Sequence, residues 1–287
     1  MKNNAKLQIL SALFLCALLL LGGCIRRVDS GQPAGQDTAE ETVLDRICAP
    51  VRYSEGADGK ETAVYRFLDG TLIGTVDEEF AAYYAEVIVP DDPQALFLPV
   101  SQMPEEGIPV SVRRFSGFSV LGEYWDEPDR YRMKLKENAL VFTAENGGKD
   151  FTRTAADNLS PRSITEEKGR EIETCYGTGA LPAALAGSWT AQDDEGDHVL
   201  IIREDGGFIR MVRPADHPVR VYVGACRVAE DGILRCLTEQ LGWAEMPFEF
   251  EYAWEMSDGG PLILRPTDSP TEEIVFTAKD VLIRGCF

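Results

Sequence analysis

The chain has 287 residues, and its 28 basic against 48 acidic side chains give a formal net charge of −20. Such an acidic chain lacks the basic surface that binding to phosphates requires, which excludes nucleic acid as a partner. Apolar residues make up 44% and charged residues 26% of the sequence, proportions that exclude a wholly disordered chain. The length allows one large domain or two smaller ones.

Residues 1–23 have the features of an export signal. Lysines but no acids occur in the first six residues, a largely apolar run covers residues 7–21, and two glycines follow. A charged start, an apolar centre and small residues at the end are typical of a signal peptide. The run is shorter than the roughly 20 apolar residues of a membrane-spanning helix. An uncleaved N-terminal anchor with a buried cysteine is the alternative.

The sequence Leu21-Gly22-Gly23-Cys24 resembles the lipobox of bacterial lipoproteins. The resemblance implies that the peptide is cut before Cys24 and that the Cys24 sulfur carries a diacylglyceryl group with acyl chains such as palmitate. Two buried chains anchor stably, since each CH₂ contributes about 0.8 kcal/mol. We therefore expect a lipid-anchored protein of the cell membrane that faces the outside of the cytoplasmic membrane. Residues 24–45 are expected to form the lipidated N-terminus and a flexible tether.

From residue 46 onward, short apolar runs alternate with turns at intervals typical of an all-β protein. In residues 131–136, Tyr131, Met133 and Leu135 alternate with basic residues. Residues 248–256 alternate aromatic side chains with Glu249, Glu251 and Glu255. No helix keeps alternate residues on one face, so both segments are predicted strands. We expect the aromatic side chains to face the interior, and Arg220 and Arg235 to lie near the acids.

The pattern predicts two small antiparallel β modules, the first covering residues 46–155 and the second residues 180–287. Residues 156–179 are polar and are predicted to be a linker with a short helix at residues 165–168. The strands that follow Tyr131 and those that follow Tyr252 come in the same order. That order indicates either two related modules or a chance likeness between two β meanders.

The second module begins with a short segment that leads into Gly187-Ser188-Trp189, and consecutive hairpins follow. This start resembles the lipocalin-like domains of bacterial lipoproteins, which are up-and-down barrels. The resemblance implies that Gly187 permits a bend and that Trp189 plugs the closed end of the barrel. It also implies that Lys279 or Arg284 covers the indole, and that the barrel is a cup for a small apolar ligand. The first module lacks this motif, and an open meander or sandwich is the alternative for the second.

Motifs for catalysis and metal binding are weak. His198 and His217 have no partner at metal-ligand spacing and are predicted to be solvated loop residues, and the acidic residues 193–197 are predicted to form a solvated turn. Ser116-Gly117-Phe118-Ser119 lacks a nucleophile elbow, and Gly177-Thr178-Gly179 lacks the third glycine of a dinucleotide site. We expect no enzymatic activity, no metal and no cofactor.

Five cysteines follow Cys24, and an exported location permits disulfides. Cys226 and Cys236 are equidistant from Asp231, so a hairpin that turns there places them opposite each other. A disulfide, two buried thiols and metal binding are the alternatives for this pair. Cys175 and Cys286 flank the second module and form a second candidate pair, which leaves Cys48 unpaired.

These features predict a non-enzymatic membrane lipoprotein that binds a small apolar ligand or a surface partner. The alternative is a structural or envelope-assembly lipoprotein whose barrels are filled, and a secreted enzyme is a third possibility. An apolar pocket of a few hundred Å³ favours ligand binding, whereas a filled interior favours the structural role.

Overall fold

The computed structural model describes residues 40–287, with gaps at 56–61, 78–81, 120–121, 159–163, 178, 216–218, 242–246, 258 and 286. Residues 40–287 form one compact unit. The predicted signal peptide, Cys24 and residues 24–39 of the predicted tether lie outside the described residues. The tether prediction is wrong at its end, because the helix α2 (Val43–Ile47) buries Val43, Leu44 and Ile47 in the first core.

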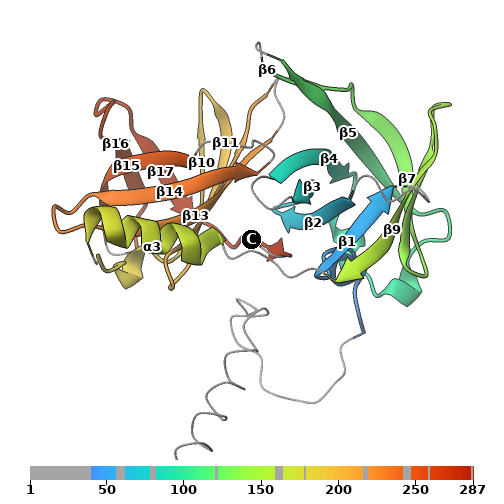
Figure 1. Ribbon diagram of the computed structural model, residues 1–287, viewed down its shortest axis with the longest axis horizontal. Helices are drawn as coiled ribbons and strands as arrows, with labels where there is room; N and C mark the ends of the chain where they lie inside the picture. The colour runs from blue at the N-terminus through green and yellow to red at the C-terminus, as the bar shows by residue number, and fades with distance from the viewer. Residues whose placement is uncertain are drawn as a thin grey trace, which may run out of the picture. The chain divides into compact units, whose positions relative to one another are not determined.

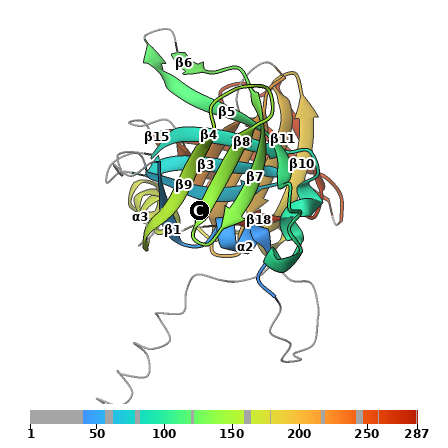
Figure 2. The same cartoon turned by 90° about the vertical axis from the view of Figure 1, so that its right-hand side faces the viewer.

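The first module is an antiparallel barrel of eight strands, closed by pairing of β1 with both β2 and β9. Figure 2 shows β9, β8 and β7 side by side, with α2 at one end of the barrel. Apolar side chains on alternate residues meet inside it, so the predicted strand at residues 131–136 is confirmed. The strands are β1 (Val51–Glu55), β2 (Thr62–Leu68), β3 (Thr71–Asp77), β4 (Ala82–Pro90), β5 (Ile108–Ser119), β7 (Asp129–Lys136), β8 (Ala139–Ala144) and β9 (Phe151–Asn158), and the short β6 (Gly122–Trp125) pairs with β5 alone. Two short 3₁₀ helices, η1 (Pro93–Phe97) and η2 (Val100–Gln102), lie between β4 and β5.

The second module is a closed eight-stranded barrel, as predicted, and not an open meander or sandwich. The short 3₁₀ helix η3 (Ala183–Leu185) leads into its first strand. Its first and last strands pair only through Trp189 with Ala278 and Thr190 with Thr277. The strands are β10 (Gly187–Asp193), β11 (Gly196–Ile202), β12 (Gly207–Arg213), β13 (Arg220–Val228), β14 (Leu234–Leu241), β15 (Pro247–Met256), β16 (Leu262–Pro266) and β17 (Ile274–Ala278).

The predicted linker is largely regular structure. Its first residues complete β9, and the helix α3 (Ile164–Tyr176) runs along the outside of β13 and β14 (Figure 1). Ile172 is 1% exposed and packs on Ala225 and Leu237, and the Thr165 hydroxyl donates to the carbonyl of Gly224 at 3.1 Å. The helix is therefore part of the second module.

The end of the chain does not belong to the second barrel. β18 (Ile283–Arg284) pairs with Leu68 and Phe67 of β2, so the predicted boundary of the second module at residue 287 is wrong. An apolar cluster also joins the modules, in which side chains on the outer face of the second barrel pack with Leu68, Ile73 and Val87 of the first. The members of this cluster from the second barrel include Val199, Ile201, Ile209, Met211, Val221, Val223 and Leu241.

The two barrels share one topology. Tyr131 lies on the sixth barrel strand of the first module, and Tyr252 lies on the sixth barrel strand of the second. In each module the seventh and eighth strands complete the meander. The two segments that suggested a repeat therefore lie at equivalent places in the two barrels.

Candidate functional site

One end of the second barrel is packed with apolar side chains. Trp189 is 6% exposed there, and its indole nitrogen donates to the carbonyl of Leu185 in η3 at 3.3 Å. A β-carbon added at Gly187 would lie 3.5 Å from the indole nitrogen of Trp189. The backbone at the start of β10 therefore lies directly against the indole ring. Lys279 or Arg284 was expected to cover this indole. Arg284 instead donates to Asp45 of α2, whereas Lys279 follows Ala278, the β17 partner of Trp189, and borders a surface hollow. Leu185, Leu200, Ile202, Phe208 and Phe276 complete this packing.

Polar side chains gather farther along the same interior, and Arg210 is at their centre. Arg210 is 8% exposed, and its Nη1 donates to the Tyr252 hydroxyl at 2.9 Å. Its Nη2 donates to Nδ1 of His198 at 3.2 Å. The buried Nε of Arg210 has no hydrogen-bond partner among the described residues. Arg210 was not among the predicted site residues, although its position between the apolar residues Ile209 and Met211 is a signal for an inward-facing cation on a strand.

The prediction that His198 is a solvated loop residue is wrong. Its side chain is buried because β11 begins at Gly196, and the alternation along that strand turns His198, Leu200 and Ile202 inward. Since Arg210 can only donate, Nδ1 of His198 accepts and Nε2 carries the hydrogen. Nε2 then donates to Asp193 at 2.7 Å. His217 lies outside the described residues.

Asp193 anchors the turn between β10 and β11 to this interior. Partial burial raises the pKa of Asp193, but hydrogen bonds from His198 and from backbone amides lower it further, so the net pKa lies below its usual range. Asp194 and Glu195 are exposed, as a solvated turn requires. Within the described ranges, no three histidine, cysteine or acidic side chains converge as a metal site would need.

Aromatic side chains form one wall beside Arg210. Phe248 and Phe250 on β15 both face the interior, and the Tyr222 ring lies edge-on to each at 5.3 Å between centroids. The Arg210 guanidinium lies 5.6 Å from the Phe250 centroid. Burial raises the pKa of Tyr252 to about 12, so this phenol stays protonated at neutral pH. Phe248 and Phe250 are only partly buried although they point inward.

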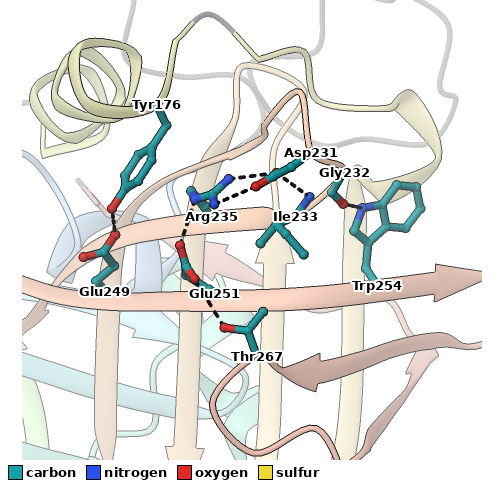
Figure 3. Close-up of polar contacts among 9 residues, drawn as sticks. All are labelled: Tyr176, Asp231, Gly232, Ile233, Arg235, Glu249, Glu251, Trp254 and Thr267. Carbon is teal, nitrogen blue, oxygen red and sulfur yellow. Dashed lines mark hydrogen bonds and ion pairs between the residues drawn. The ribbon is translucent and has the colours of Figure 1, made fainter.

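The outer face of β15 carries its acids, as predicted (Figure 3). Glu251 accepts from Arg235 at 2.8 Å, and Arg235 also binds Asp231. The hydrogen bond from Arg235 is the main cause that lowers the pKa of Asp231 to about 2. Glu249 binds the Tyr176 hydroxyl of α3, which fastens the end of that helix to the barrel. Among the described residues Arg220 forms no ion pair with these acids, and Glu255 is paired with Arg265 instead.

Cys226 and Cys236 face each other across β13 and β14, as predicted. Ala229 and Ile233 form a hydrogen-bonded pair next to the turn, because the Ala229 amide donates to the Ile233 carbonyl. Hydrogen-bonded and non-hydrogen-bonded pairs alternate along an antiparallel ladder, so Cys226 and Cys236, three pairs farther along, form a non-hydrogen-bonded pair. Both are buried thiols, and burial raises the pKa of the Cys236 thiol well above its usual range. Cys175 is an exposed thiol and Cys48 a buried one, whereas Cys286 lies outside the described residues.

A surface hollow of about 420 Å³ lies beside the seam between β10 and β17. The two strands stop pairing beyond Thr190 and Thr277, which leaves Gln192 and Val275 on opposite sides of the hollow. His198 also borders the hollow, although its side chain is buried. Asp69, Arg213 and Lys279 make the lining strongly polar.

The remaining motifs have structural explanations. Ser116 lies inside β5, whereas a nucleophile elbow needs a turn between a strand and a helix. Gly177 directly follows α3 with a φ of +82°, the conformation that ends many helices.

Comparisons with protein-family models, curated proteins and solved structures found no match to this chain. In the part of the chain that the structure describes, no helix has both the length and the apolar character needed to cross a bilayer.

Proposed function

We propose that the chain is a lipid-anchored, extracytoplasmic lipoprotein without enzymatic activity, whose second barrel binds a small, mainly apolar ligand. The observation that carries this proposal is the exposure of Phe248 and Phe250. Both point into a closed barrel yet remain partly exposed, whereas Phe208 and Phe276 in the same interior are 1% exposed. Apolar surface that faces inward and is reached by solvent is typical of a ligand site.

The lipid anchor is supported by the lipobox at Leu21-Gly22-Gly23-Cys24 and the apolar run before it. Because the thioether attaches to sulfur, Cys24→Ser abolishes lipid attachment and releases the protein from membranes. Fractionation of cells labelled with a radioactive fatty acid tests this. A serine variant that still carries label in the membrane fraction contradicts the lipoprotein proposal.

The proposal that the barrel has no enzymatic activity is supported by the hydrogen bonds of His198. Both ring nitrogens of His198 already form hydrogen bonds, one with Asp193 and one with Arg210. A general base needs a nitrogen lone pair within reach of a substrate proton. His198 is therefore suited to holding Arg210 and the turn in place.

A structural or envelope-assembly role is the second candidate. It is favoured by the tight packing around Trp189 and by the buried apolar cluster that joins β11, β12 and β13 to the first module. In this case the ligand site would be absent and the surface would make the functional contacts.

Mass spectrometry of an organic extract from the purified full-length protein separates the two candidates. Ligand binding predicts a small molecule that is enriched with the wild-type protein and lost from a Phe248→Lys variant. The filled-barrel alternative predicts no enriched molecule, and also no saturable binding of the neutral fluorescent probe N-phenyl-1-naphthylamine.

A further inference from the structure

We propose that the ligand of the second barrel carries one anionic head group, and that Arg210 binds it. This inference rests on the proposed function and names its ligand class, an amphiphile with a carboxylate or a similar planar or tetrahedral anion at one end. Three features of the interior support it: the charge balance around Arg210, the donors that Arg210 has left, and the aromatic wall beside it.

The charge of Arg210 is poorly balanced. The side chain is nine-tenths buried, and its hydrogen bonds go to Tyr252 and to a neutral nitrogen of His198. The only acid within 4 Å of Arg210 among the described residues is Glu195, whose Oε2 lies 3.9 Å from Nη2, too far for a hydrogen bond. A buried cation without a hydrogen-bonded counter-ion is costly, so an anion at this position would be stabilised.

Arg210 also has donors to offer. A guanidinium has five N–H groups, and the hydrogen bonds within the described residues use one on each terminal nitrogen. Nε has no hydrogen-bond partner there. Nε and Nη2 form one edge of the guanidinium, and a carboxylate can accept from both together. Glu195 approaches Nη2 and is 60% exposed, so a ligand anion would have only a weak ion pair to replace.

The surroundings of Arg210 suit the apolar part of an amphiphile. The Phe250 ring lies beside the guanidinium, and Tyr222 and Phe248 extend the same wall. The chain as a whole carries a charge of −20, which opposes unspecific attraction of anions. Anion binding at this site would therefore depend on Arg210.

Two fluorescent probes with one ring system test the inference on the full-length protein. 1-Anilinonaphthalene-8-sulfonate carries an anion, and N-phenyl-1-naphthylamine is its neutral counterpart. We expect Arg210→Gln to weaken binding of the sulfonate about tenfold or more, because a charge-assisted contact is lost. Binding of the neutral probe should change less than about twofold. Arg265→Gln, which removes an arginine from the outside of the same barrel, should change neither affinity.

Glu195→Gln is the reciprocal variant and keeps the test valid if Arg210→Gln does not fold, which near-ultraviolet circular dichroism would show. Removing the competing carboxylate should strengthen sulfonate binding about threefold or more without affecting the neutral probe. If both probes bind and neither variant changes sulfonate binding, the inference is overturned while the proposed function stands. If neither probe binds to the wild-type protein, the proposed function itself is overturned.

Discussion

Tyr53 and Trp189 hold equivalent positions in the two barrels. Each lies buried on the first strand of its barrel, at 3% and 6% exposure respectively. The Tyr53 hydroxyl donates to the carbonyl of Arg46 in α2 at 3.0 Å, and the Trp189 indole donates to the carbonyl of Leu185 in η3 at 3.3 Å. A large aromatic side chain with one polar atom thus joins a short helix to the barrel in both modules.

Truncation of Trp189 should destabilise the second barrel strongly. We expect Trp189→Ala to lower the free energy of unfolding by about 3–5 kcal/mol, because it leaves a cavity in a closed core. Tyr53→Phe, which removes only one hydroxyl, should cost about 1 kcal/mol. Denaturant unfolding followed by circular dichroism measures both. A loss below about 1 kcal/mol for Trp189→Ala would show that the indole does not fill the core.

The register of β15 predicts opposite outcomes at two adjacent positions. Phe250→Asp places a carboxylate inside the barrel and should cost more than about 3 kcal/mol or prevent folding. Glu251→Gln keeps a hydrogen-bond acceptor and removes only the charge from a partly buried ion pair with Arg235, so it should cost about 1 kcal/mol. Soluble yield and thermal unfolding report the difference. The register is reversed if Glu251→Gln proves the more damaging change.

Cys226 and Cys236 have the strand pairing that a cross-strand disulfide requires. Refolding in the presence of oxidised glutathione should convert the Cys226 and Cys236 thiols into one protein disulfide. The two electrons pass to the glutathione disulfide, which is released as two molecules of reduced glutathione. Closing this short loop should stabilise the barrel by about 3 kcal/mol. Mass spectrometry of the refolded protein should show the loss of two hydrogens. The Cys226→Ala variant should show neither this change in mass nor the gain in stability. Capture of glutathione by either cysteine without ring closure would contradict the geometry.

Tyr252 should make the second barrel sensitive to alkali. Its pKa is raised to about 12, mainly by burial, so the folded state holds the phenolic proton more tightly than the unfolded state. The associated stability is complete below about pH 10 and is lost as the pH rises towards 12. The loss amounts to about 2–3 kcal/mol. The free energy of unfolding, measured across this pH range, should fall less in Tyr252→Phe than in the wild-type protein. An equal fall in both would show that a group other than Tyr252 is responsible.

Alternation in the sequence predicted the strands, but not everything that packs around them. Residues 248–256 alternate large apolar side chains with three acids and Ala253, so their inward and outward faces were evident from the sequence. Residues 156–179 are polar on average, so the sequence predicted only residues 165–168 as helix, whereas α3 covers Ile164–Tyr176. Ile164 and Ile172 provide most of the apolar contact of this helix. β18 has only two residues and pairs with a strand more than 200 positions earlier, a contact that no local pattern reveals.

The candidate site was harder to predict than the fold. The acidic residues before His198 suggested a solvated loop, yet the turn ends at Gly196 and the strand carries the imidazole inward. Arg210 lies on an apolar strand, and its role depends on His198 from β11 and Tyr252 from β15. Three strands must be placed together before these contacts are visible, and sequence spacing alone does not do this.

Binding of N-phenyl-1-naphthylamine to the wild-type protein and to two lysine variants of β15 shows whether the interior of the second barrel holds a ligand site. Phe248 faces the interior, whereas Ala253 on the same strand is exposed on the outside. We predict saturable binding of one probe per wild-type chain, loss of that binding in Phe248→Lys, and unchanged binding in Ala253→Lys. No saturable binding to the wild-type chain, or equal binding to a folded Phe248→Lys variant, would contradict a ligand site inside the second barrel.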